Sequence, residues 1–261
     1  LGLLNESLPL YQRAVEALTY SFGPRHLDVL NARSGLGVLY EYMGRHAEAE
    51  SVQQAVLKDF KRLMGPDHTQ TLVSCRALCE VYRATGRFAE EEILHRDVLA
   101  RHLSARGELH PETLFTRTLL AANLEHQGCT EEAEVELRKY LAGWRAVSGL
   151  ESPEYLGAEC SLAYFLGRTK RLDQAETMLR SLLERAKGFG KPLRGQVAGI
   201  YVELALVRER QGGLEEADML LDQATESVST IEVEDPGLSS YCLFVRAAFL
   251  RRQSRDHEAE P

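Results

Sequence analysis

Residues 107–114 read Gly-Glu-Leu-His-Pro-Glu-Thr-Leu, and Gly128 follows fourteen residues later, ahead of the run Glu-Glu-Ala-Glu at 131–134. Working outward from this stretch, a turn recurs every 42 residues, with Gly in four of its five copies, at Gly44, Gly86, Gly128, Lys170 and Gly212. A leucine stands eight residues before each turn, at Leu36, Leu78, Leu120, Leu162 and Leu204. A period this long, without insertion or deletion, predicts repeated units that stack on one another.

A second turn lies half a period away, and between the two turns run segments of about 15 to 18 residues whose apolar residues recur at spacings of three and four. Gly at the segment ends suits a left-handed C-terminal cap, and Pro111 and Pro153 suit a first helical turn. No alternating run predicts a strand. We therefore predict an all-α fold, a right-handed superhelical solenoid of antiparallel helix pairs.

The register divides residues 1–253 into one solenoid. The predicted pieces are a half repeat at 3–22, full repeats at 27–64, 69–106, 111–148, 153–190 and 195–231, a half repeat at 237–253, and a polar tail at 254–261. The half repeats at both ends and the missing initiator Met lead us to expect a piece of a longer protein.

The amino-acid composition argues against several classes of function. The chain has 31 Lys plus Arg against 39 Asp plus Glu, a formal charge of −8, which argues against nucleic-acid binding. No stretch has the roughly 20 apolar residues of a membrane span, and no secretory signal opens the chain. The five scattered cysteines predict reduced thiols in a cytoplasmic protein, with Cys75 and Cys79 as small buried residues and not metal ligands.

Two short stretches resemble catalytic or phosphate-binding motifs but lack the surroundings or spacing that those motifs require. His95-Arg96-Asp97 resembles a kinase catalytic loop but falls inside a predicted helix, and residues 188–191, Gly-Phe-Gly-Lys, lack the spacing of a phosphate loop. His26, His68 and His110 are 42 residues apart in turns, so they should serve structure and not converge on a metal. We expect no enzymatic activity, cofactor or metal.

Residues 107–114, together with Gly128 and residues 131–134, resemble the tetratricopeptide repeat in its 42-residue form, as in kinesin light chain. The resemblance implies that first helices line a concave groove that holds a partner peptide or helix. It also implies an Asn-Asn pair before each repeat leucine, but here residues such as Ser34-Gly35 and Arg76-Ala77 stand instead. Recognition of particular side chains is therefore expected over clamping of a peptide backbone.

Helical geometry selects the groove face. The predicted partner-binding residues are Asn31, Ser34, Arg76, Glu80, Arg83, Phe115, Thr118, Tyr164, Val202 and Leu206. In one interpretation an apolar anchor of the partner lodges against Phe115 and Tyr164 while an acidic group reaches Arg76 and Arg83. In the other, Arg76 and Glu80 form an ordinary surface pair and the aromatic residues seal neighbouring helices.

The sequence thus predicts a non-enzymatic protein-interaction scaffold, or adaptor. The alternative is the C-terminal sensor of a nucleotide-binding oligomerising signalling NTPase of the STAND type whose motor lies outside this chain. The helix at 238–252 is apolar on more than one face, so it makes a poor solenoid cap. We expect it to contact either another copy of the chain, in self-association, or a continuation of the chain beyond this sequence.

Overall fold

The computed structural model describes residues 2–188, 194–229 and 236–258, and these form twelve α-helices and no strand. The helices are α1 (Gly2–Phe22), α2 (Leu27–Tyr42), α3 (His46–Met64), α4 (Thr69–Ala84), α5 (Phe88–Arg106), α6 (Pro111–His126), α7 (Thr130–Ser148), α8 (Pro153–Arg168), α9 (Leu172–Gly188), α10 (Arg194–Arg210), α11 (Leu214–Ser229) and α12 (Pro236–Glu258). The predicted all-α class is confirmed within these ranges.

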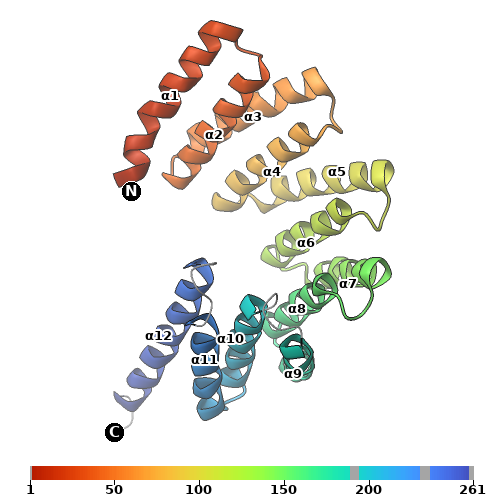
Figure 1. The fold of residues 1–261 in the computed structure, drawn as a ribbon, viewed down its shortest axis with the longest axis vertical. Coiled ribbons are helices and arrows are strands. Elements are labelled where there is room, and N and C mark those ends of the chain that lie inside the picture. The colour runs from red at the N-terminus through yellow and green to blue at the C-terminus, as the bar shows by residue number, and fades with distance from the viewer. Residues whose placement is uncertain (1, 189–193, 230–235, 259–261) are drawn as a thin grey trace. The chain divides into compact units, whose positions relative to one another are not determined.

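The chain divides into two compact units, unit 1 (Leu1–Glu136) and unit 2 (Leu137–Pro261). In unit 1, each helix from α1 to α5 packs on the next helix along the chain (Figure 1). In unit 2, α8 to α12 pack in the same sequential way, and α10 also contacts α8 and α12. Sequential packing of hairpins is the arrangement that the repeat register predicts.

The turns within the pairs follow from backbone conformation. Gly44, Gly86, Gly128 and Gly212 have φ between 70° and 87°, a region that glycine enters without steric cost. Lys170 occupies the same slot with φ 63°, and it is the one non-glycine residue with positive φ among those described. Four of the five slots thus use the expected glycine, and the fifth holds a strained lysine.

The turns between the pairs depend on a capping side chain. His26, His68 and His110 each accept a hydrogen bond at Nδ1 from the backbone N–H two residues later, at 3.2 to 3.3 Å. Ser152 caps α8 in the same way, because its hydroxyl oxygen accepts a hydrogen bond from the backbone N–H of Tyr155 at 3.1 Å. These bonds satisfy N–H groups that the first helical turn leaves free, so the repeated histidines are helix caps.

Ion pairs also repeat with the register on the second helices of the pairs. Arg96 of α5 bonds Glu132 of α7 at 2.8 Å. The same pair recurs two periods later, where Arg180 of α9 bonds Glu216 of α11 at 2.6 Å. The predicted full-repeat ranges each cover two helices, except that α10 begins one residue before the range 195–231. Their grouping into one continuous solenoid stays a prediction.

Candidate functional site

The ten predicted groove residues all lie on first helices of the pairs. Unit 1 holds Asn31 and Ser34 on α2, Arg76, Glu80 and Arg83 on α4, and Phe115 and Thr118 on α6, while unit 2 holds Tyr164 on α8 and Val202 and Leu206 on α10. Joint action of Phe115 and Tyr164 on one anchor would involve both units, and it stays a prediction.

A cavity of about 220 Å³ opens in unit 1 where α4, α5 and α6 meet; we call it the α4–α6 pocket. Two of the predicted groove residues, Arg76 and Phe115, line it together, and Phe115 remains 45% exposed. Leu72, Val73 and Leu119 add apolar wall. The pocket therefore combines an apolar surface with a guanidinium group in one place.

Arg76 and Arg83, the two arginines predicted to bind an acidic group of a partner, differ in whether their side chains already have a partner within the unit. Arg83 bonds Glu80 at 3.0 Å and the carboxylate of Glu91 at 2.7 and 3.0 Å. Arg76 forms no ion pair with any described residue, and the expected surface pair between Arg76 and Glu80 is absent. Arg83 is thus already paired inside the unit, and binding of a ligand by both arginines stays a prediction.

A buried polar network stands behind Arg83. Glu91 is fully buried at a register position that holds alanine in the other four repeats, at Ala49, Ala133, Ala175 and Ala217. Its carboxylate accepts hydrogen bonds from Arg83, from Asn123 Nδ2 at 2.9 Å and from His95 Nε2 at 3.2 Å. Burial alone would raise the pKa of Glu91, but these donors outweigh it and the pKa is lowered. Glu91 thus keeps its negative charge inside the unit.

Cys79 and His95 bring this network to the wall of the α4–α6 pocket. Because an ionised Glu91 can only accept, His95 donates from Nε2, and its Nδ1 lies 4.0 Å from Cys79 Sγ. The order thiol, imidazole, carboxylate resembles a nucleophilic triad. However, burial first, and the charge of Glu91 second, raise the pKa of the Cys79 thiol far above its usual range. The thiol stays protonated, and the arrangement does not support a nucleophile.

Sequence reasoning placed Cys79 correctly as a buried residue but missed the network around it. The signal was present, because Glu91 breaks an otherwise uniform alanine slot. Asn123 likewise stands where the other repeats carry Leu39, Val81, Phe165 and Val207. Polar residues at two apolar positions of one repeat junction are a pattern that a comparison of the repeats alone reveals.

The equivalent junction in unit 2 has a small residue where unit 1 has Phe115. Gly199 is the register counterpart of Phe115, and a Cβ added to it would lie 3.1 Å from the hydroxyl oxygen of Tyr164. Burial, followed by the charges of Cys160 and Glu203, raises the pKa of Tyr164. Val202 is fully buried and belongs to the core, whereas Leu206 is half-buried. Tyr164 of α8 therefore lies against α10, and both interpretations of the aromatic residues stay predictions.

The remaining predicted residues have mixed surroundings within unit 1. Asn31 is exposed. The Ser34 hydroxyl donates to Gln53 Oε1 at 3.3 Å, and the Ser34 carbonyl accepts from Gln53 Nε2 at 3.0 Å. The Thr118 hydroxyl donates to the carbonyl of Phe115 at 2.7 Å. Ser34 thus binds the neighbouring helix α3, and Thr118 binds within its own helix α6.

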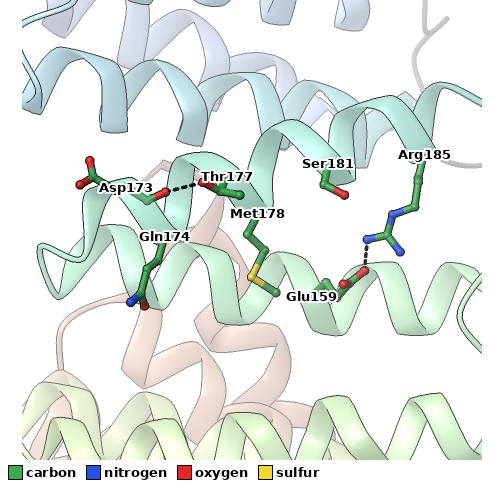
Figure 2. Close-up of a pocket in the computed structure, with 7 residues that line it drawn as sticks. All are labelled: Glu159, Asp173, Gln174, Thr177, Met178, Ser181 and Arg185. Atoms are coloured by element: carbon green, nitrogen blue, oxygen red, sulfur yellow. Dashed lines mark hydrogen bonds and ion pairs between the residues drawn. The ribbon is translucent and has the colours of Figure 1, made fainter.

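A second pocket, of about 480 Å³, lies along α9 in unit 2, and Figure 2 shows the seven residues that line it. Six of the seven come from α9, and Glu159 of α8 completes the set. Glu159 forms an ion pair with Arg185, and Thr177 donates to the carbonyl of Asp173 at 2.8 Å (Figure 2). Met178 is the single apolar side chain among the seven.

The described residues give no group of three His, Cys, Asp or Glu side chains arranged to hold a metal ion. Within residues 2–188, 194–229 and 236–258, no helix combines the length and the apolar character that crossing a bilayer requires.

Comparison with known proteins identifies the type of repeat. The tetratricopeptide repeat family model matches residues 1–62 and 42–104. Among solved structures, BtubC (BKLC) from P. vanneervenii is 18% identical with a TM-score of 0.68, covering 90% of this chain and 94% of that one. A putative kinesin light chain with nearly identical TPR-like repeats from Podosopora anserina is 22% identical with a TM-score of 0.65, covering 78% and 96%. A search of curated proteins finds no match.

A more distant structure is a Rap protein complexed with Competence and Sporulation Factor, 10% identical with a TM-score of 0.56, covering 97% of this chain and 72% of that one. At these identities the structures show the fold alone. The matches described here do not support the alternative of a sensor domain from a signalling NTPase.

Proposed function

Since the resemblance to tetratricopeptide repeat proteins of the kinesin light chain type is confirmed, we propose that this chain binds a protein partner through the first helices of its repeats. Repeats of this type are typical of protein–protein interaction scaffolds and are generally non-catalytic. We further propose that the partner is a peptide segment or helix that inserts one apolar side chain into the α4–α6 pocket and sets an adjacent carboxylate on Arg76.

The single observation that carries this proposal is the joint presence of Arg76 and Phe115 on one cavity. A cavity of about 220 Å³ lies below the size range of roughly 300 to 1,000 Å³ that is usual for small-molecule sites, and it suits a single side chain. Partly exposed Phe115 and Val73 would bury apolar surface against that side chain.

Charge supports an acidic neighbour for the inserted side chain. Arg76 has no ion-pair partner among the described residues, and Arg106, which also lines the pocket, is exposed. The chain as a whole carries a charge of −8, so an acidic segment would be repelled from most of its surface. A free guanidinium beside an apolar pocket would therefore favour one orientation of the segment.

The test is a peptide selection followed by binding measurements. Displayed peptides selected on the intact chain should share an apolar residue next to Asp or Glu, and Arg76→Glu should weaken their binding at least tenfold, or about 1.4 kcal/mol. Arg62→Glu is the matched control, since Arg62 is an exposed arginine on α3 outside the pocket. Selected peptides without acidic residues, or equal affinity for Arg76→Glu and Arg62→Glu, would contradict the proposal.

A further inference from the structure

His102 of α5 is a buried imidazole that lines the α4–α6 pocket, and only 5% of the residue is exposed. Its Nδ1 lies 3.0 Å from the hydroxyl oxygen of Thr116 on α6, and that hydroxyl donates its own proton to the backbone carbonyl of Glu112 at 2.7 Å. Because the Thr116 oxygen can then only accept, His102 donates from Nδ1. This hydrogen bond fixes the tautomer of the neutral ring and leaves Nε2 without a proton.

The unprotonated Nε2 of His102 opens to the pocket. It has no hydrogen-bond partner among the described residues, and it is not one of the described polar atoms that the protein encloses completely without a partner. Since Nδ1 is engaged by Thr116 and the ring lines the cavity, Nε2 is the atom that His102 presents to an entering group. A ligand that supplies a partner for this largely buried nitrogen gains affinity from it.

The charges that face His102 keep its ring neutral in the free chain. Burial first, and the charge of Arg106 second, lower the pKa of His102 below its ordinary value of 6.5. The carboxylate of Glu112 opposes this shift, and His110 in the preceding turn adds to it. The other titratable or charged residues that line the pocket are Arg76 and Cys79 on α4 and His95 on α5. An entering carboxylate would work against the shift, because it attracts the proton that Arg106 repels.

We propose that the acidic group of the partner contacts His102 as well as Arg76, and that His102 takes up a proton at Nε2 in order to donate a hydrogen bond to it. This inference rests on the proposed binding of an acidic segment at the α4–α6 pocket. The proton comes from the solvent, and the resulting imidazolium donates from both ring nitrogens, to Thr116 and to the carboxylate. A charge-assisted hydrogen bond of this kind is stronger than a neutral one.

Proton uptake gives the binding a pH dependence of fixed sign. The carboxylate raises the pKa of His102 in the complex above that in the free chain. The added affinity is therefore fully present below the pKa of the free chain and is lost as the pH rises through the pKa of the complex. Asp and Glu of a peptide stay ionised between pH 6 and pH 8, since their ordinary pKa values are about 4. We expect an affinity about tenfold higher at pH 6 than at pH 8.

The experiment measures the binding of one synthetic peptide to the intact chain by titration calorimetry at pH 6, 7 and 8. The probe is the tightest acidic peptide from the selection described above, made without histidine. Its matched control carries Asn or Gln in place of the acidic residue. Titrations of the acidic peptide at pH 7, in buffers of different ionisation enthalpy, should show a net uptake of protons. The control peptide should bind with the same affinity at pH 6 and pH 8 and without proton uptake.

His102→Gln removes the titratable ring, while the amide N–H groups of glutamine can still donate to Thr116. This variant should bind the acidic peptide at pH 8 about as tightly as the unmodified chain does, without the increase at pH 6 and without proton uptake. His26→Asn is the matched control, since His26 caps α2 outside the pocket and Asn also caps helices well. It should behave as the unmodified chain does. Circular dichroism should show the same helix content in both variants.

Two results would overturn the inference and leave the proposed function intact. One is an acidic peptide that Arg76→Glu weakens but that binds the unmodified chain equally at pH 6 and pH 8, without proton uptake. The other is a pH dependence that persists in His102→Gln. If no acidic peptide binds the chain at any pH, the proposed function itself fails and the inference falls with it.

Discussion

Two repeat junctions that occupy equivalent positions in the register, one in each unit, have opposite interiors. At the junction of α4, α5 and α6 in unit 1 stand Cys79, Glu91, His95 and Asn123, and at the junction of α8, α9 and α10 in unit 2 the same positions hold Ala163, Ala175, Leu179 and Val207. The first junction is polar and bears a pocket, whereas the second holds apolar residues at these positions and has the Tyr164 hydroxyl against Gly199. The backbone accepts both solutions, so the polar one is not a requirement of the fold.

The largest expected effect is from Glu91→Ala. This change removes an acceptor that Arg83, His95 and Asn123 share, and it leaves Nε2 of the buried His95 without that partner. We expect the protein to lose about 1 to 3 kcal/mol of stability, as is usual when a buried hydrogen-bonding group loses its partner. Urea unfolding followed by circular dichroism, with hydrogen exchange of α4 to α6 as the local measurement, provides the check.

The matched control gives unit 1 the residues of unit 2. In the triple variant Glu91→Ala, His95→Leu and Asn123→Val, apolar packing replaces the whole network, so most of the lost stability should return. If the triple variant is as unstable as Glu91→Ala alone, the polar residues are needed by the fold of unit 1, and the comparison between the junctions fails.

A smaller effect, opposite in sign between the two units, is expected from pH. Burial opposes the ionisation of Glu91, but its hydrogen bonds outweigh burial and lower its pKa below the ordinary value of 4.5. Its stabilising contribution is therefore present above that value and is lost as the pH falls through the folded pKa. Burial raises the pKa of Glu203 on α10, against the charges of Arg168 and Arg210. Ionised Glu203 therefore destabilises unit 2, and this penalty disappears as the pH falls below about 4.5.

Glutamine variants separate the two carboxylates. At pH 7, Glu203→Gln should slow hydrogen exchange in α10 and α12, and this gain should vanish below about pH 4.5. Glu91→Gln should speed hydrogen exchange in α4 to α6 at pH 7. Its difference in exchange from the unmodified chain should shrink only as the pH falls through the lowered pKa of Glu91. Shifts of the same sign in both variants at pH 7 would show that the two carboxyl groups do not differ as described.

The smallest effect concerns the turns. Lys170 adopts φ 63° in a slot where Gly44, Gly86, Gly128 and Gly212 also have positive φ. Lys170→Gly should stabilise unit 2 by about 1 kcal/mol, because a left-handed conformation costs a non-glycine residue about 1 to 2 kcal/mol and the added flexibility of the unfolded chain offsets part of that gain. Thermal unfolding measures the shift, and an unchanged or lower midpoint would contradict it.

Much of the fold could be predicted from the sequence because helix ends are local events. The glycine slots, Pro111 and Pro153 marked helix boundaries, and the structure places both prolines in the first turn of their helices. The candidate site was less predictable. Helical spacing put Arg76 and Arg83 on one face, but it gave no account of Glu91, which reaches Arg83 from the next helix.

The sequence by itself determined the repeat period, the helices and the face on which groove residues lie, since these depend on the spacing of neighbours along one helix and on the recurrence of the same turn. Only the tertiary structure decided which of those residues are available to a partner. Availability depends on side chains brought together from different helices: Glu91 occupies Arg83, Tyr164 packs against Gly199, and Arg76 and Phe115 remain together on an open pocket.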